Sequence, residues 1–214
     1  SEFAVDKVYT KLVHFAYITL TSEVGPGLNN WFAAYQTPHV FDVPTAAANQ
    51  LMVDFALVKY SSTSFRIMPA AVFEAGAAYK TAMAPYMDGF TKAPYTMVTV
   101  NRNAITPEVF NSLEWDGQMM EFLDAKIKAP VAEGGENYNF YGTNRRFNGV
   151  LQVGKGFIIG WGQWSPIQNH AFGIVMVKEY SVVNGVATAT LEIKVPAEDM
   201  RTKYNPLSLF DYTP

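Results

Sequence analysis

The sequence contains no cysteine, which excludes a disulfide-stapled scaffold, a zinc–thiolate site and a cysteine nucleophile. It contains no Asn-x-Ser/Thr sequon, which argues against a secreted glycoprotein. No apolar run approaches the length of a membrane-spanning helix and no signal peptide is visible, so we expect no membrane insertion.

Charge is also scarce. Only 16% of the residues are Asp, Glu, Lys or Arg, where about 25% is usual. A solitary protein of this size faces water over most of its surface, whereas contacts between subunits are depleted in charge. The deficit favours a surface covered by identical subunits. A surface built from Ser, Thr, Asn and Gly is the alternative that composition leaves open.

What is present indicates one globular domain. The 214 residues are 49% hydrophobic and 14% aromatic, enough for a substantial core. We expect a single domain over residues 1–214, with a core sandwich at about 7–196 and a C-terminal tail at 197–214. Eight runs rich in β-branched and aromatic residues predict strands at 8–21, 51–69, 95–101, 126–131, 147–153, 156–164, 171–183 and 186–195.

The connections between these runs indicate the architecture. Only Asn184-Gly185 has the signature of a two-residue hairpin turn, and the other links are long. Thr106-Pro107-Glu108 predicts the start of a short helix ending near Leu113, and residues 70–84 are compatible with another. We therefore expect an all-β fold, a single eight-stranded antiparallel jelly roll of two packed sheets with long loops and one or two short helices.

The run from Leu51 to Pro69 is far longer than an ordinary strand. The polar stretch from Ser61 to Ser64 interrupts it. We expect Leu51 to Tyr60 to lie in the core and a bend or bulge at the serines. Residues 65–68 would then continue toward a different face.

Residues with catalytic chemistry form no recognisable pattern. The three histidines, His14, His39 and His170, have no metal-ligand spacing, and the glycines from Gly154 to Gly160 precede a strand rather than a helix. We expect no enzyme activity, no cofactor and no metal. Two rival interpretations rest on acids in loops: a glycosidase or a calcium site using members of Asp116, Glu121, Asp124, Glu133, Glu136, Glu198 and Asp199.

Basic residues near aromatic ones are the features that favour nucleic-acid binding. Arg145 and Arg146 follow the aromatic stretch 138–141, and Lys155 lies in a turn. The overall charge of −3 points the other way, and taken alone the two arginines fit a solvated loop end better than a binding role.

The order of features resembles the single jelly-roll capsid proteins of small icosahedral viruses, most of all the circovirus type with circular single-stranded DNA. The resemblance is carried by VDFALVKYSSTSFRIMP, TMVTVNRNAITPEVFNSLEW, GVLQV, GFIIGWGQW and GIVMVKEYSVV, and by the segments 126–130 and 143–147. It covers about residues 5–196 and is one of pattern rather than of specific motifs. The arginine-rich arm usual in that family is not in this sequence, and the sequence leaves open whether such an arm precedes Ser1. Jelly-roll capsids of nodavirus type match about as well in outline.

The resemblance implies a viral coat protein that self-assembles into an icosahedral shell around a genome, single-stranded DNA or, alternatively, RNA. Its partners would be identical subunits and the genome, with an unidentified host receptor, and its place the virion, or the host cell during assembly. We assign genome contacts to Arg145, Arg146, Lys155 and Lys11. We assign interface contacts to Trp31, Trp115, Trp161 and Trp164, for which burial in the core is the equal alternative. The rival function is a lectin-like carbohydrate-binding jelly-roll module.

Overall fold

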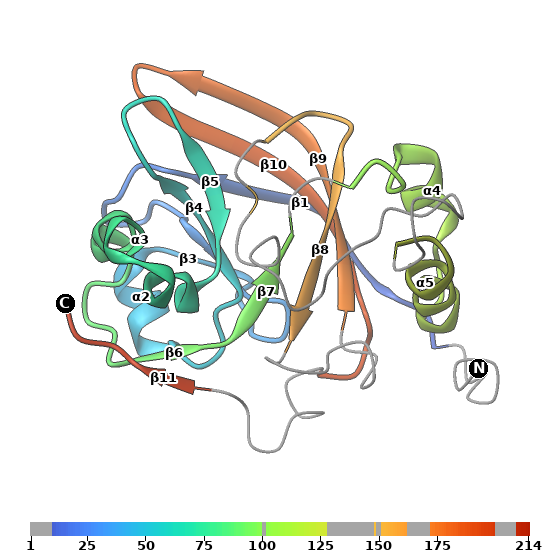
Figure 1. Cartoon of the computed structure of the whole chain (residues 1–214), viewed down its shortest axis with the longest axis horizontal. Helices are drawn as coiled ribbons and strands as arrows, with labels where there is room; N and C mark the ends of the chain where they lie inside the picture. Colours follow the sequence, from blue (N-terminus) through green and yellow to red (C-terminus); the bar gives the residue numbers. More distant parts are fainter. Residues whose placement is uncertain (1–9, 100–101, 128–147, 149–150, 162–171, 200–208) are drawn as a thin grey trace.

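The computed structural model describes residues 10–99, 102–127, 148, 151–161, 172–199 and 209–214. Within them the chain is mostly β, with two packed antiparallel sheets and short helices, which confirms the all-β prediction (Figure 1). The larger sheet has the order β1-β10-β9-β8-β7, with bounds Val13–Thr21 (β1), Val186–Val195 (β10), Phe172–Val183 (β9), Gly156–Trp161 (β8) and Thr96–Val98 (β7).

The second sheet has the order β3-β2-β4-β5, with bounds Val40–Phe41 (β3), Trp31–Phe32 (β2), Phe55–Lys59 (β4) and Phe65–Met68 (β5). A two-stranded sheet pairs Leu209–Asp211 (β11) with Lys92–Pro94 (β6). The helical segments are Val43–Ala48 (α2), Ala70–Ala75 (η1), Ala77–Met83 (α3), Ala84–Tyr86 (η2), Pro107–Ser112 (α4), Asp116–Phe122 (α5) and the π-helical turn Leu123–Ile127 (η3).

The eight-stranded jelly roll is not confirmed by the described strands. They number eleven, in sheets of five, four and two. Strands β8, β9 and β10 follow one another along the chain and are also neighbours in the larger sheet. That part of the sheet is a meander, whereas a jelly roll is built from two Greek keys.

The prediction that the strand at 51–69 bends or bulges at the serines and continues toward a different face is wrong. The chain reverses at the serines, and β4 pairs antiparallel with β5, with Lys59 opposite Phe65. The Ser61 hydroxyl accepts hydrogen bonds from the amides of Thr63 (3.3 Å) and Ser64 (3.1 Å). A short hydroxyl side chain that bonds nearby backbone stabilises a turn, so the polar stretch closes a hairpin rather than bending a strand.

Two other strand predictions fail in their described parts. Residues 126–127, expected to begin a strand, end the π-helical turn η3, and residues 128–131 lie outside the described part of the chain. In the segment 147–153, Asn148 forms an isolated bridge with Ile67, and residues 151–153 form no strand.

Three local predictions are confirmed. Asn184 and Gly185 have positive φ angles of 51° and 74° and join β9 to β10. Thr106 caps α4, since its hydroxyl accepts a hydrogen bond from the Val109 amide at 3.2 Å. The segment 70–84 contains the helical elements η1 and α3.

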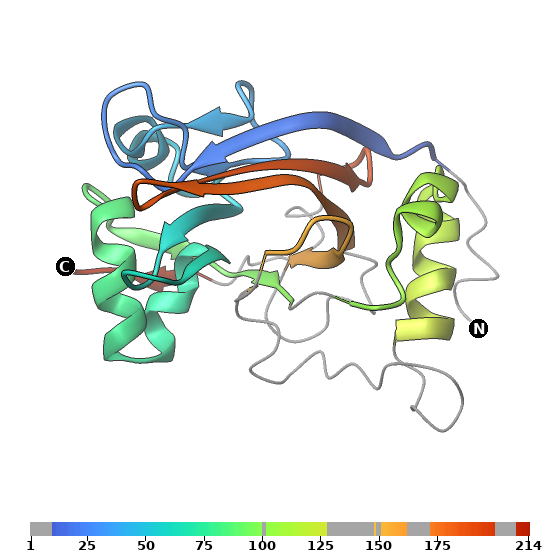
Figure 2. The same cartoon turned by 90° about the horizontal axis from the view of Figure 1, so that it is seen from above.

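Hydrophobic side chains fill three clusters. The main cluster lies between the two larger sheets and takes alternate residues of β10, namely Ala187, Ala189, Leu191, Ile193 and Val195. A second cluster joins the other face of the four-stranded sheet to α3, η2 and β6. A third joins the outer face of the larger sheet to α4 and α5. Figures 1 and 2 show α2 and α3 at one end of the sandwich and α4 and α5 at the other.

The C-terminal segment docks on the second cluster. Phe210 in β11 lies against Tyr95, with ring centroids 5.7 Å apart, and Tyr212 meets Phe73 edge-on at 5.0 Å. Tyr212 is buried, and its amide donates to the Thr91 carbonyl. The end of the predicted tail is therefore packed against the body of the protein.

Tyr86 supplies a prediction about pH. Its buried hydroxyl donates to the Ser22 carbonyl (2.6 Å) and accepts from the Lys59 amide (2.9 Å), and burial raises the pKa of this phenol above 10.0. The unfolded chain loses the phenol proton at lower pH than the folded protein does. Stability is therefore expected to fall as the pH rises through the window above 10.

Replacing Tyr86 with phenylalanine is expected to cost about 1–2 kcal/mol at neutral pH, because two hydrogen bonds are lost, and to flatten the alkaline part of the profile. Urea unfolding between about pH 7 and 11 measures both effects. Tyr17→Phe, at a 79% exposed side chain, is the control and should leave the free energy of unfolding unchanged. An unaltered alkaline slope in Tyr86→Phe would contradict the assignment.

Candidate functional site

Strand β1 lies at the end of the strand order of the larger sheet. Its sequence, VHFAYITLT, contains no Asp, Glu, Lys, Arg or Pro. Figure 2 shows it along the outer side of the sheet, on the side that lies at the back in Figure 1. Natural edge strands are usually blunted by charge, proline or bulges; β1 has neither charge nor proline and carries a single bulge between Phe15 and Ile18.

Large apolar side chains are exposed along this strand and on the tip of the β9–β10 hairpin. Tyr17 in β1 is 79% exposed and Val183 at the tip is 63% exposed. The others among the described residues are Val13, Val24, Leu51, Trp115, Val153, Val182 and Leu209.

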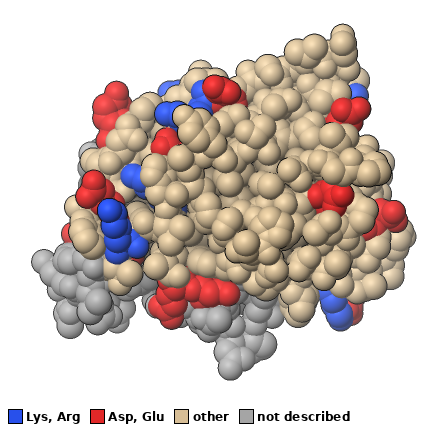
Figure 3. Space-filling view, turned by 180° about the vertical axis from the view of Figure 1, so that it is seen from behind, with Lys and Arg blue, Asp and Glu red and all other residues tan. Residues whose placement is uncertain are grey.

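The side of the molecule that carries β1 is poor in charge. Figure 3 shows this side, and the Lys, Arg, Asp and Glu side chains lie mostly toward its margins, around a broad central area without them. The low charge content of the sequence therefore includes one continuous area of surface without charged side chains. Such a surface fits contact with another protein better than contact with water.

A β-bulge lies in the middle of β1. Phe15 pairs with Ile193 and Ile18 pairs with Leu191, so Ala16 and Tyr17 together oppose one residue of β10. The bulge marks the point at which the exposed Tyr17 leaves the regular ladder. It divides the edge of β1 into two short regular stretches.

The outer face of the larger sheet carries a polar cluster that the sequence analysis did not identify. The His14 Nε2 and Glu192 Oε2 atoms are 2.9 Å apart, and Lys178 Nζ lies 3.5 Å from Glu192 Oε1. Beside them, the buried Lys194 donates to the carbonyls of Phe110 and Leu113, both at 2.7 Å. Desolvation lowers the pKa of Lys194, and the nearby charges of Glu192 and Glu114 oppose that shift.

This cluster attaches α4 to the outer face of the larger sheet. Lys194 satisfies carbonyls at the C-terminal end of α4, where a cation is favourable, and so fixes α4 on the sheet. Side chains alternate along β10, so the sequence predicts that Thr190, Glu192 and Lys194 share one face of the strand. The burial of Lys194 under α4 depends on tertiary packing, which the strand pattern does not give.

Two of the four predicted genome-binding residues, Lys11 and Lys155, lie in the described part of the chain. Lys11 is exposed at the start of β1, where it forms a bridge with Trp115. Lys155 is half-buried in the turn before β8, and its carbonyl accepts from the Val177 amide. Arg145 and Arg146 lie outside the described residues.

The four tryptophans divide into different roles. Trp31 and Trp161 have no exposed surface, and their indole N–H groups donate to the Tyr86 carbonyl and to Asp54, both at 2.9 Å. Of the two roles that the sequence left open, these two have the core role and are not available as interface anchors. Trp115 is 37% exposed and precedes α5. Trp164 lies outside the described residues.

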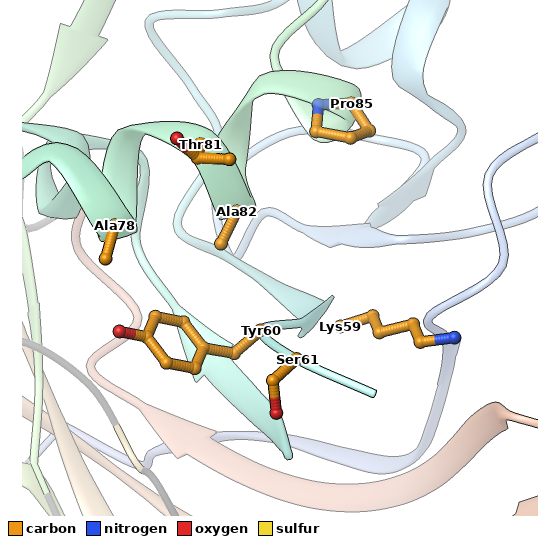
Figure 4. A pocket seen from close by; sticks show the side chains of 7 residues that line it. All are labelled: Lys59, Tyr60, Ser61, Ala78, Thr81, Ala82 and Pro85. Carbon is orange, nitrogen blue, oxygen red and sulfur yellow. The ribbon is translucent and has the colours of Figure 1, made fainter. Parts of the chain in front are cut away.

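A hollow of about 520 Å³ lies between the end of β4 and α3 (Figure 4). The Tyr60 ring forms part of its wall and is backed by the Arg66 guanidinium, 3.6 Å from the ring centroid. The other lining residues are Lys59, Ser61, Ala78, Thr81, Ala82 and Pro85. This lining offers hydroxyls, an ammonium group and an aromatic ring, but no carboxylate or imidazole for acid–base catalysis.

The described part of the chain contains no group of three or more His, Asp or Glu side chains placed to hold a metal ion. No helix within it is long and apolar enough to cross a membrane. Comparisons with protein-family models, with curated proteins and with solved structures give no match to this chain.

Proposed function

We propose that this chain is the coat protein of a small icosahedral virus, which assembles with identical copies into a closed shell around a nucleic-acid genome. The genome is single-stranded DNA in this proposal, with RNA as the alternative. The protein then resides in the virion, or in the host cell during assembly. It binds no cofactor and catalyses no reaction.

The observation that carries this proposal is the charge-poor side of the molecule with the uncharged edge strand β1. Burying such a surface costs little desolvation of charge, and copies of the same chain are the simplest partners that cover it. The two-layered β architecture is compatible with this role. The eight-stranded jelly roll belongs to the same proposal, although the meander of β8, β9 and β10 departs from that topology.

Particle formation tests the proposal directly. The purified chain is expected to elute as megadalton particles or assembly intermediates, and negative-stain micrographs are expected to show closed shells of uniform diameter. Copurified nucleic acid should resist nuclease inside the particles. Reversing the charges of Arg145 and Arg146 should lower the nucleic-acid content. A monomer at every protein concentration and ionic strength would overturn the proposal.

Carbohydrate binding is the second candidate, and the hollow beside Tyr60 favours it. An aromatic ring with neighbouring hydroxyls can stack on and hydrogen-bond a sugar ring. The same size measurement separates the two candidates, because a lectin-like module would elute as a monomer or small oligomer. Glycan binding that is lost in Tyr60→Ala would then support the second candidate.

A further inference from the structure

We propose that two copies of this chain pair edge to edge through β1, antiparallel and about a two-fold axis. The pairing would join the five-stranded sheet of one copy to the five-stranded sheet of the other, and so form one continuous sheet. The inference rests on the proposed function, because it assigns one contact between neighbouring subunits of the shell. The partner that covers the β1 edge is therefore a second copy of the same chain.

The backbone groups of β1 that point away from β10 can be identified from the hydrogen bonds at its two ends. The Leu12 amide donates to the Glu114 carbonyl (2.8 Å), and the Thr21 amide donates to the Asn29 carbonyl (2.9 Å). Alternate residues of a strand direct their backbone groups to the same side. Counting inward by two from each end gives His14 and Thr19 as the outward-facing residues between these contacts.

The bulge makes this edge complementary to itself. A two-fold axis between Ala16 and Tyr17 pairs His14 of one copy with Thr19 of the other, and the same contact repeats on the other side of the axis. The amides of Leu12 and Thr21 are already bonded to Glu114 and Asn29 of the same chain, so the open stretch of the edge lies between these two residues and is centred on the axis. The outward amides and carbonyls therefore meet in register in an isologous interface.

The side-chain directions agree with this register. His14 meets Glu192 and Thr19 meets Thr190, and both of these partners lie on the face of β10 opposite the main core cluster. Directly paired residues in an antiparallel ladder must share a face, as His14 and Thr19 do. Tyr17, 79% exposed, would lie next to the axis and lose most of its contact with water.

Charge complementarity points to a second copy as the partner. Lys11 just before β1 and Glu23 just after it are both exposed, with no ion pair among the described residues. An antiparallel partner brings Lys11 of one copy close to Glu23 of the other. The dimer then has two symmetry-related Lys11–Glu23 contacts, one on each side of its uncharged centre. A parallel pairing would instead place Lys11 beside Lys11 and Glu23 beside Glu23.

A cysteine cross-link tests the contact, and the natural absence of cysteine makes the readout unambiguous. In Tyr17→Cys, position 17 of each copy lies next to the axis. The Cα atoms of the two positions then fall within the separation that a disulfide requires, about 4.4–6.8 Å. Mild oxidation is expected to convert most of the protein to a covalent dimer. Ser181→Cys is the matched control, because Ser181 is also exposed but lies in β9, two strands from the edge, and little dimer is expected.

A charge exchange tests the register independently. Lys11→Glu and Glu23→Lys are each expected to weaken the dimer roughly tenfold, since each exposed contact contributes about threefold and occurs twice. The double variant Lys11→Glu/Glu23→Lys should recover the original dissociation constant. Additive weakening in the double variant would overturn the register.

The outcomes separate this inference from the proposed function. Closed particles without a Tyr17→Cys cross-link would refute the β1 pairing and leave the coat function standing. Cross-linked dimers in a protein that never forms particles would support the pairing and refute the shell. Equal cross-linking of Tyr17→Cys and Ser181→Cys in folded protein would refute a specific contact at this edge.

Discussion

Replacing Asp54 with alanine is expected to lower the free energy of unfolding by about 4 kcal/mol. Asp54 has no exposed surface, and its two oxygens accept from the Ala34 amide (2.6 Å) and from the Trp161 indole N–H (2.9 Å). Removing the carboxylate leaves two buried donors unsatisfied, at about 1–3 kcal/mol each. Because Trp161 belongs to β8 and Asp54 precedes β4, the lost contact also links the two sheets.

Urea unfolding of matched variants measures this effect. Asp54→Asn keeps an acceptor oxygen and should lose less than Asp54→Ala. Asp88→Ala, at an exposed carboxylate, should change stability by less than about 0.5 kcal/mol. A loss below about 1 kcal/mol in Asp54→Ala would show that the bridge between the sheets contributes little.

Replacing Gly156 with alanine is expected to destabilise the protein by about 2–3 kcal/mol through overpacking. A Cβ atom at Gly156 would lie 2.2 Å from Ile105 Cγ2 and 3.0 Å from the Ile105 carbonyl. Ile105 is itself buried, and the Arg102 amide binds the Gly156 carbonyl at 2.7 Å. The loop before α4 is thus held close to β8 and has little room to move away.

Gly154→Ala is a matched control two residues earlier. Its Cβ would meet nothing within 4 Å, but its φ of +80° is unfavourable for alanine, which costs about 1–2 kcal/mol. The two variants therefore separate crowding from backbone strain. In the Ile105→Ala background, Gly156→Ala should cost less than it does in the original protein, because the crowding side chain has been shortened. An equal cost of Gly156→Ala in both backgrounds would contradict the crowding argument.

Local signals in the sequence predict local structure well in this protein. Asn184-Gly185 and the Thr106 cap act through contacts within a few residues, so their outcome does not depend on the rest of the fold. The apolar segments on both sides of Ser61 to Ser64 suit either one bent strand or two paired strands. The sequence was interpreted as the bent strand, whereas the structure has the two paired strands β4 and β5. Only the pairing of β4 with β5 decides between these possibilities, and pairing is a tertiary property.

The candidate site was harder to predict than the fold. Composition indicated that part of the surface is covered, but not which part, because charge content is an average over the chain. The edge position of β1 depends on the strand order of the sheet. Tryptophan suits cores and interfaces alike, so burial separates Trp31 and Trp161 from Trp115 where residue type does not.

The pairing of β1 with β10 has a consequence for how the chain folds during synthesis. His14 and Glu192 meet across 178 residues, whereas β9 and β10 are joined by the two-residue turn Asn184-Gly185. At about 5–20 residues per second, a newly made β1 waits roughly 10–35 s for its neighbour to be translated. During that interval both sides of β1 are open, so cellular chaperones that shield nascent strands are expected to govern the yield of the folded protein.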